Sequence, residues 1–154
     1  MAKIPCFAPP GGLSLPHSNE ELFRLASKAR ARAHAPYSNF FVGCAIESVD
    51  GETVLGANVE NACYRLGQCA EQVALGAAQQ AFGLGKVARI AIVGGPRKAE
   101  SGGDIVTPCG GCRQAIAEAA CLADAPIEIL CGDADGARYV RHTLEDLLPQ
   151  AFTL

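Results

Sequence analysis

The sequence lacks the features that mark membrane, secreted and nucleic-acid-binding proteins. Hydrophobic residues make up 49% of its 154 residues, yet no uninterrupted apolar run is long enough to cross a bilayer. Like charges do not cluster, and the formal net charge is only −3, so we expect neither a nucleic-acid nor a membrane partner. The first sixteen residues lack the apolar core of a secretory signal. These absences predict a soluble, cytoplasmic, globular protein whose partners are small molecules.

Cysteine and histidine contents narrow the possible chemistry. The eight cysteines are about 5% of the chain, below the roughly 8 to 10% that is typical of a small disulfide scaffold. In a reducing compartment, clustered cysteines indicate metal binding or catalysis rather than disulfides. Only three histidines are present, and none lies near a cysteine motif in the sequence: His17, His34 and His142. A cysteine hydrolase, which needs a histidine base, is therefore disfavoured.

Hydrophobic patterns and turn signals predict an α/β domain. We expect an irregular arm over residues 1–17 and a single domain over residues 18–154. Helices are predicted over 18–33, 69–82, 110–122 and after Thr143, and strands over 40–49, 53–59, 88–93, 127–131 and 137–141. Because helices alternate with short buried strands, the predicted fold class is a three-layer α-β-α sandwich with a five-stranded mixed sheet.

Two cysteine motifs at predicted helix starts are the strongest functional signal. Cys109 and Cys112 form a Cys-x-x-Cys after Pro108, and Cys69 begins a Cys-x-Glu that ends at Glu71. A helix N-terminus carries about half a positive charge, which favours thiolates. Three thiolates are ligands that zinc prefers, so we predict a zinc site made by Cys69, Cys109 and Cys112. The other five cysteines are predicted to be small core residues: Cys6, Cys44, Cys63, Cys121 and Cys131.

Three protein ligands leave one tetrahedral position open, which distinguishes a catalytic zinc from a structural one. Water in that position becomes a usable nucleophile near pH ~7. Glu71 lies in the first helical turn, where its carboxylate can accept a proton from that water and pass it on. The alternative is a structural zinc site sealed by a fourth thiolate from Cys63, Cys121 or Cys44.

Between Glu20 and Phe152 the chain strongly resembles the small, homotetrameric cytidine deaminases. The resemblance rests on these segments: APYSNF (35–40), VG (42–43), NVENACY (58–64), CAE (69–71), PCGGCRQ (108–114) and LLP (147–149). A glutamate acid/base and a Pro-Cys-x-x-Cys are general features of the zinc deaminases. The resemblance implies hydrolytic deamination of cytidine or deoxycytidine by one zinc ion per subunit, with Glu71 as the proton shuttle. It also implies a homotetramer whose active sites are shared between subunits.

Further residue roles follow from the same resemblance. Asn58 and Glu60 match the residues that bind the ribose, and the backbone around Ala70 is expected to face the base edge. Phe40 and Phe152 match aromatic residues that pack on base and sugar, and the residue at the position of Phe152 comes from a neighbouring subunit. Without the family, Glu60 reads as a solvated strand end, Asn58 as a turn residue and Phe40 as a core residue.

One position departs from the family pattern. Family members commonly have arginine directly after the glutamate, where it offsets the charge of the zinc thiolates, whereas this chain has Gln72. Arg113, Arg65 or the helix dipoles are candidates to compensate for the missing charge. Two alternative functions therefore stay open: a blasticidin-S-deaminase-like enzyme that acts on a modified cytosine nucleoside, and a non-catalytic, zinc-stabilised binding protein.

Overall fold

The helices and strands follow the predicted order. The structure is a computed structural model that describes residues 15–123 and 125–153, so most of the predicted N-terminal arm, with Cys6, lies outside the described residues. The elements are α1 (Asn19–Arg30), β1 (Phe40–Ser48), β2 (Thr53–Ala57), α2 (Ala70–Ala81), β3 (Val87–Pro96), α3 (Gly110–Leu122), β4 (Glu128–Gly132), β5 (Tyr139–His142) and α4 (Leu144–Leu147).

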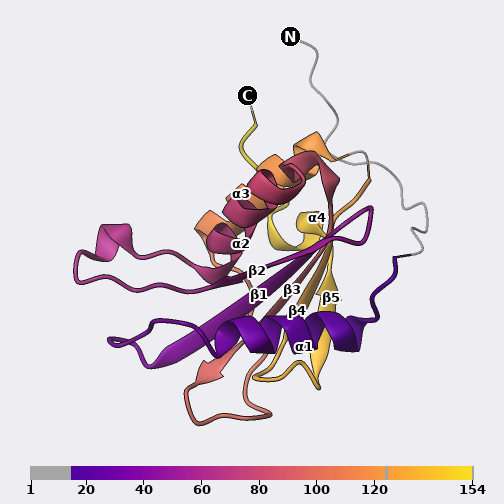
Figure 1. Cartoon of the computed structure of the whole chain (residues 1–154). Helices are drawn as coiled ribbons and strands as arrows, with labels where there is room; N and C mark the ends of the chain where they lie inside the picture. The colour runs from indigo at the N-terminus through magenta and orange to yellow at the C-terminus, as the bar shows by residue number, and fades with distance from the viewer. Residues whose placement is uncertain (1–14, 124, 154) are drawn as a thin grey trace.

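Five strands form one mixed sheet in the order β2-β1-β3-β4-β5 (Figure 1). β1 pairs antiparallel with β2 and with β3, and β4 pairs antiparallel with β5. The β3–β4 pair is parallel, so its connection must cross over the sheet, and this crossover contains α3. The predicted α-β-α sandwich with a five-stranded mixed sheet is confirmed.

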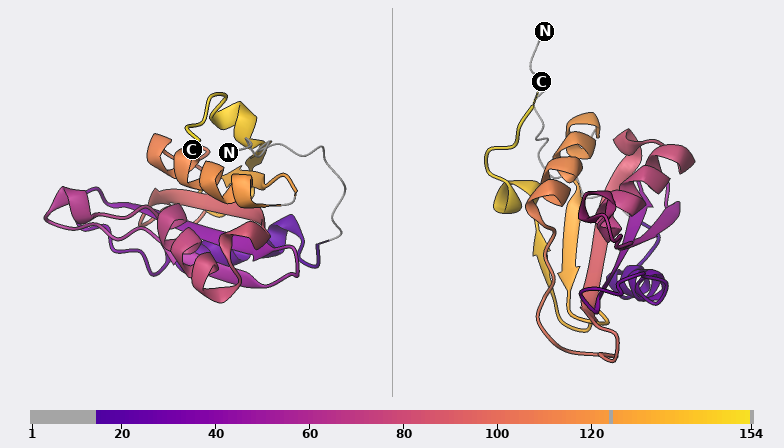
Figure 2. Two further views of the ribbon diagram at one scale, coloured as in Figure 1. Left: turned by 90° about the horizontal axis from the view of Figure 1, so that it is seen from above. Right: turned by 90° about the vertical axis from the view of Figure 1, so that its left-hand side faces the viewer.

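Helices cover both faces of this sheet. In Figure 1, α1 crosses below the strands, whereas α2 and α3 lie above them, and Figure 2 shows α2 and α3 side by side. Alternate side chains of β3 point to opposite faces: Ile90 and Ile92 pack with α2 and α3, and Ala91 and Val93 pack with α1. This two-sided burial explains why residues 90–93 of β3 are all apolar.

Local sequence signals place the helix starts. The predicted capping boxes are both present, one pairing Ser18 with Glu21 at α1 and the other pairing Thr143 with Asp146 at α4. Two short 3-10 helices, η1 (Tyr64–Leu66) and η2 (Leu84–Lys86), are not predicted, because three residues are too few to show a period. β3 also extends to Pro96, past the predicted end of that strand.

The predictions for the additional cysteines have mixed outcomes. Cys44 and Cys131 are fully buried core residues, as predicted. Cys63 is exposed, so its assignment to the core is wrong, because it lies in the loop between β2 and α2 that projects from the sheet (Figure 1). Cys121 is half-buried in the last turn of α3. In the described part of the chain, no helix has the length and apolarity needed to cross a membrane.

Candidate active site

The N-termini of α2 and α3 meet at one place above the sheet. Cys69 is the N-cap residue of α2, Cys109 is the N-cap residue of α3, and Cys112 lies in the first turn of α3. The sulfur of Cys109 lies 3.8 Å from that of Cys69 and 3.5 Å from that of Cys112. Two connections that cross the same face of the sheet therefore bring together thiols that are far apart in the sequence.

The spacing of these sulfur atoms fits zinc. A Zn–S bond of about 2.3 Å places the sulfur atoms of a tetrahedral site about 3.8 Å apart. All three thiols lie within 4.8 Å of one another, and among the described residues no fourth His, Cys, Asp or Glu joins the group. Cys121 is nine residues beyond Cys112 on the same helix, about 13 Å away by the helical rise, so it cannot close the site. The chain can therefore supply three ligands and leave a fourth position open.

The protonation of the thiols differs from the sequence-based prediction. Burial raises the pKa of Cys69 and of Cys112, and the nearby charge of Glu71 raises both further. For Cys109, burial opposes ionisation, but hydrogen bonds from the Cys112 backbone and thiol and from the Cys69 thiol lower its pKa. The helix N-termini alone therefore do not make all three groups acidic. A bound cation has to displace the protons from Cys69 and Cys112.

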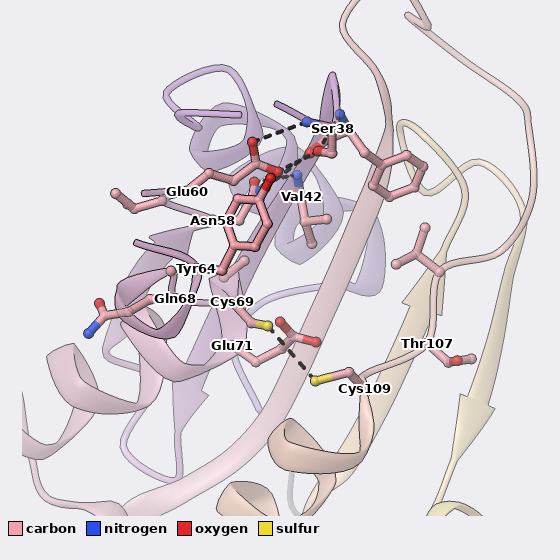
Figure 3. Close-up of a pocket in the computed structure, with 15 residues that line it drawn as sticks. Ser38, Val42, Asn58, Glu60, Tyr64, Gln68, Cys69, Glu71, Thr107 and Cys109 are labelled. Atoms are coloured by element: carbon pink, nitrogen blue, oxygen red, sulfur yellow. Dashed lines mark hydrogen bonds between the residues drawn. The ribbon is translucent and has the colours of Figure 1, made fainter. Parts of the chain in front are cut away.

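Glu71 is the second residue of α2 and faces the same pocket. Only 4% of the residue is exposed, and Figure 3 shows its carboxylate beside the Cys69–Cys109 pair. Burial raises the pKa of Glu71 above its usual value. A raised pKa brings a carboxyl group closer to neutral pH, where it can both accept and donate a proton.

The pocket in front of these groups has a volume of about 440 Å³, within the roughly 300 to 1,000 Å³ that is typical of small-molecule sites. Phe40, Asn58, Glu60 and Ala70 line it, as the resemblance implies. The pocket has further lining residues that were not predicted from the sequence: Ser38, Val42, Val59, Tyr64, Gly67, Gln68, Val106 and Thr107. Four of them stand inside the quoted motifs APYSNF, VG and NVENACY, which is the only signal that pointed to them.

Glu60 is more than a solvated strand end. One carboxylate oxygen accepts hydrogen bonds from the backbone N–H groups of Tyr37 and Ser38, at 2.9 and 3.2 Å. The other accepts the Ser38 hydroxyl at 2.5 Å. These bonds, that of the Ser38 hydroxyl first, lower the pKa of Glu60. Glu60 therefore stays ionised and shapes the turn before β1, with acceptor capacity left for a ligand hydroxyl.

Asn58 joins the end of β2 to the start of β1. Its side-chain oxygen accepts the Val42 N–H at 2.8 Å, and its side-chain nitrogen donates to the Phe40 carbonyl at 3.0 Å. The amide thus acts as an extra rung of the sheet and keeps one N–H for a ligand. Phe40 is partly exposed beside it, and Ala70 is fully buried at the pocket floor.

The remaining predicted residues lie outside the pocket of their own chain. Phe152 is 68% exposed, and two hydrogen bonds join its backbone to the side-chain amide of Gln114, at 2.8 and 3.0 Å. The Arg113 guanidinium donates to the backbone carbonyls of Pro108 and Leu147, each at 2.8 Å. Gln72 is exposed on α2, and its side-chain nitrogen lies 3.7 Å from the place that a Cβ on Gly111 would occupy.

Known proteins share both the sequence and the fold. Residues 16–124 match the family described as the cytidine and deoxycytidylate deaminase zinc-binding region. The chain is 41% identical over 134 residues to a cytidine deaminase from Halalkalibacterium halodurans, which covers 86% of this chain and 92% of the relative. It is 38% identical over 132 residues to a cytidine deaminase from Mycobacterium tuberculosis, covering 84% of this chain and 85% of the relative.

Solved structures agree with the sequence comparisons. The crystal structure of a cytidine deaminase from Burkholderia pseudomallei superposes with a TM-score of 0.76 at 38% identity, over 88% of this chain and all of that one. The cytidine deaminase from Mycobacterium tuberculosis gives a TM-score of 0.68 at 36% identity, over 87% of this chain and 96% of that one. Family match, relatives and structures point the same way: the chain belongs to the cytidine and deoxycytidylate deaminase zinc-binding family.

Proposed function

We propose that this protein is a zinc-dependent deaminase that hydrolyses cytidine, deoxycytidine or both to the uracil nucleoside and ammonia. The observation that carries the proposal is the arrangement at the pocket floor, where three thiols at tetrahedral spacing adjoin a buried glutamate of raised pKa. Relatives of nearly the same length are cytidine deaminases. When bound, zinc supplies Lewis-acid activation of a water molecule at neutral pH.

The chain's own residues provide binding and proton transfer. Glu71 accepts one proton from the attacking water and delivers it to the ring nitrogen beside the reacting carbon. It then accepts the second proton, from the hydroxyl group added to that carbon, and delivers it to the departing amino group, which leaves as ammonia. Phe40 packs on the base, and the Ala70 backbone meets the base edge at the pocket floor. The spare N–H of Asn58 and the spare acceptor sites of Glu60 hold sugar hydroxyls.

We further propose that the protein is a homotetramer in which Phe152 completes the pocket of a neighbouring subunit. The exposed ring of Phe152, held by its backbone on α3 and absent from the pocket of its own chain, supports this role. Large apolar side chains are also exposed on the projecting loop beside the pocket, among them Tyr64 and Leu66, and such side chains are typical of an interface. A cytoplasmic location suits a site of three thiols, because the cytosol keeps cysteines reduced.

The function is tested by following the ultraviolet absorbance of cytidine and deoxycytidine with zinc-loaded protein. We expect deamination, and we expect Glu71→Ala to retain zinc while losing at least ~100-fold in turnover. A Glu71→Ala variant with most of the original rate would refute the assignment of the proton shuttle. No turnover of either nucleoside by a protein with one zinc per chain would refute the proposed substrate.

A mixing experiment tests the shared site. Glu71→Ala and Phe152→Ala subunits are co-expressed with different tags, and the hybrid oligomers are purified by both tags. Random pairing would restore roughly a quarter of the wild-type rate, because one site in four then combines an intact Glu71 with a neighbour's intact Phe152. Hybrids no more active than the two parents would exclude sharing of Phe152.

A further inference from the structure

Gly56 lies in β2 directly beneath the first turn of α2, the helix that begins at Cys69 and carries Glu71. A Cβ at Gly56 would stand 2.3 Å from the Ala70 carbonyl oxygen and 2.4 Å from the Ala74 nitrogen. It would also stand 2.8 Å from the Ala74 side chain. The helix backbone therefore rests on the strand with no side chain between them.

Space, rather than backbone conformation, requires glycine at this position. Gly56 is buried in a regular strand, and its φ is not among the positive values that Gly51, Gly83 and others adopt. Any residue could adopt its backbone, but ordinary contact begins at 3.4 Å, so a methyl group would have to displace α2 by about 1.1 Å. Glycine inside a strand commonly marks such a close approach of two backbones.

That displacement would act on one side of the thiol cluster only. Cys69 belongs to α2, whereas Cys109 and Cys112 belong to α3, whose backbone is not among the close contacts of Gly56. The Cys69 and Cys109 sulfur atoms are 3.8 Å apart, the separation of two sulfur ligands on one zinc ion. Protein–zinc distances tolerate about 0.2 Å, much less than the expected shift.

We propose that Gly56 is a positioning residue that sets the place of Cys69 and Glu71 relative to the Cys109–Cys112 pair. It acts through α2 and touches neither the metal nor the substrate. The inference rests on the zinc site of the proposed function. If Gly56 has this role, adding a side chain at position 56 weakens the binding of the metal.

Gly43 offers a matched control. A Cβ at Gly43 would stand 2.0 Å from the Ala26 carbonyl oxygen and 2.4 Å from the Arg30 nitrogen, both in α1. The clash has the same form, but α1 covers the opposite face of the sheet and carries none of the thiols. Gly76, exposed on α2 with no heavy atom within 4 Å of an added Cβ, provides the control without a clash.

The experiment measures metal binding in the full chain by zinc competition against a chromogenic chelator and by the absorption spectrum of the Co²⁺ form. Thermal unfolding is recorded on the same samples. We expect Gly56→Ala to bind zinc at least ~10-fold more weakly and to alter the thiolate-to-cobalt bands. Gly43→Ala is expected to lose stability yet keep the affinity and the spectrum. Gly76→Ala is expected to keep the affinity and the spectrum and to gain slightly in stability, because alanine favours a helix interior over glycine.

A Gly56→Ala protein with unchanged zinc affinity and an unchanged cobalt spectrum would overturn the proposal. Equal loss of metal in Gly43→Ala would also overturn it, because the effect would then be general destabilisation. If Gly56→Ala does not fold, Gly56→Ala/Ala74→Gly, which removes one of the three clashes, is judged by the same two results. A chain that binds cobalt through three thiolates but deaminates neither cytidine nor deoxycytidine would refute the proposed function and leave the role of Gly56 standing.

Discussion

Removal of Arg89 is predicted to destabilise the fold strongly without touching the active site. Glu47 in β1 is fully buried, and one of its oxygens accepts a hydrogen bond of 2.8 Å from the Arg89 guanidinium. Its other oxygen pairs with the His17 ring at 2.7 Å, and Arg89 also binds Asn19 at 3.0 Å. Arg89→Met leaves a buried carboxylate with His17 as its remaining partner, so we expect the low end of the ~3 to 5 kcal/mol typical of breaking a buried ion pair.

Urea unfolding of the zinc-saturated protein measures this loss, and about 3 kcal/mol corresponds to roughly 6 to 12 °C in Tm for a chain of this size. The double variant Glu47→Leu/Arg89→Met removes both charges and should cost less than Arg89→Met alone. Lys86→Met is the surface control. Lys86 and Asp50 are 2.6 Å apart but each about half exposed, so water already screens their attraction and breaking the pair should change the stability little.

Either of two outcomes would refute this prediction: a loss below ~1 kcal/mol for Arg89→Met, or a double variant whose loss equals the summed losses of Arg89→Met and of Glu47→Leu, each measured as a single variant. Zinc content and turnover of the folded variant should match the unaltered chain. Glu47 lies five residues along β1 from Val42, the lining residue of that strand nearest to it, which is about 17 Å by the rise of a strand.

Three further predictions concern single side chains. The pKa of Asp133 is lowered because hydrogen bonds, those of Arg138 foremost, outweigh its burial, so its contribution to stability is present above about pH 4 and is lost as pH falls through its folded pKa. The difference in urea midpoint between the unaltered chain and Asp133→Asn should therefore narrow below that pH, and a wider difference would contradict this. Gln72→Arg places a cation beside the thiolates and should move the acid limb of the pH–rate profile down by about one unit, whereas an unchanged profile would show that the charge is already compensated. Gln114→Ala frees the Phe152 backbone and should raise KM roughly 3- to 10-fold with little change in kcat, and an unchanged KM would show that the two hydrogen bonds do not place the ring.

Local signals in the sequence predict the elements that depend on local chemistry. The capping residues Ser18 and Thr143 begin their helices, and Asp50-Gly51 separates the paired strands β1 and β2. The Cys-x-x-Cys and Cys-x-Glu motifs predict that three thiols meet, because each motif stands at a helix start. These features are encoded within a few residues, so they can be read without knowing the fold.

Features that depend on packing could not be predicted in this way. The sequence indicates acidic thiols at helix starts, but burial raises the pKa of Cys69 and Cys112, and burial is a property of the whole fold. Ser38 and Thr107 reach the pocket from loops, which have no hydrophobic period to reveal them. The role of Gly56 cannot be predicted from the sequence either, because only the folded structure shows how closely α2 approaches it.

Because the thiols are divided between α2 and α3, zinc binds the folded protein in preference to the unfolded chain. Cys69 and Cys109 are separated by strand β3, so the unfolded chain offers a Cys-x-x-Cys pair without its third partner nearby. Mass action then stabilises the native state by about 1.4 kcal/mol for each tenfold excess of free zinc over the dissociation constant. The melting temperature of this protein therefore depends on the concentration of free zinc. A chelator in the buffer lowers that temperature, just as a destabilising mutation would.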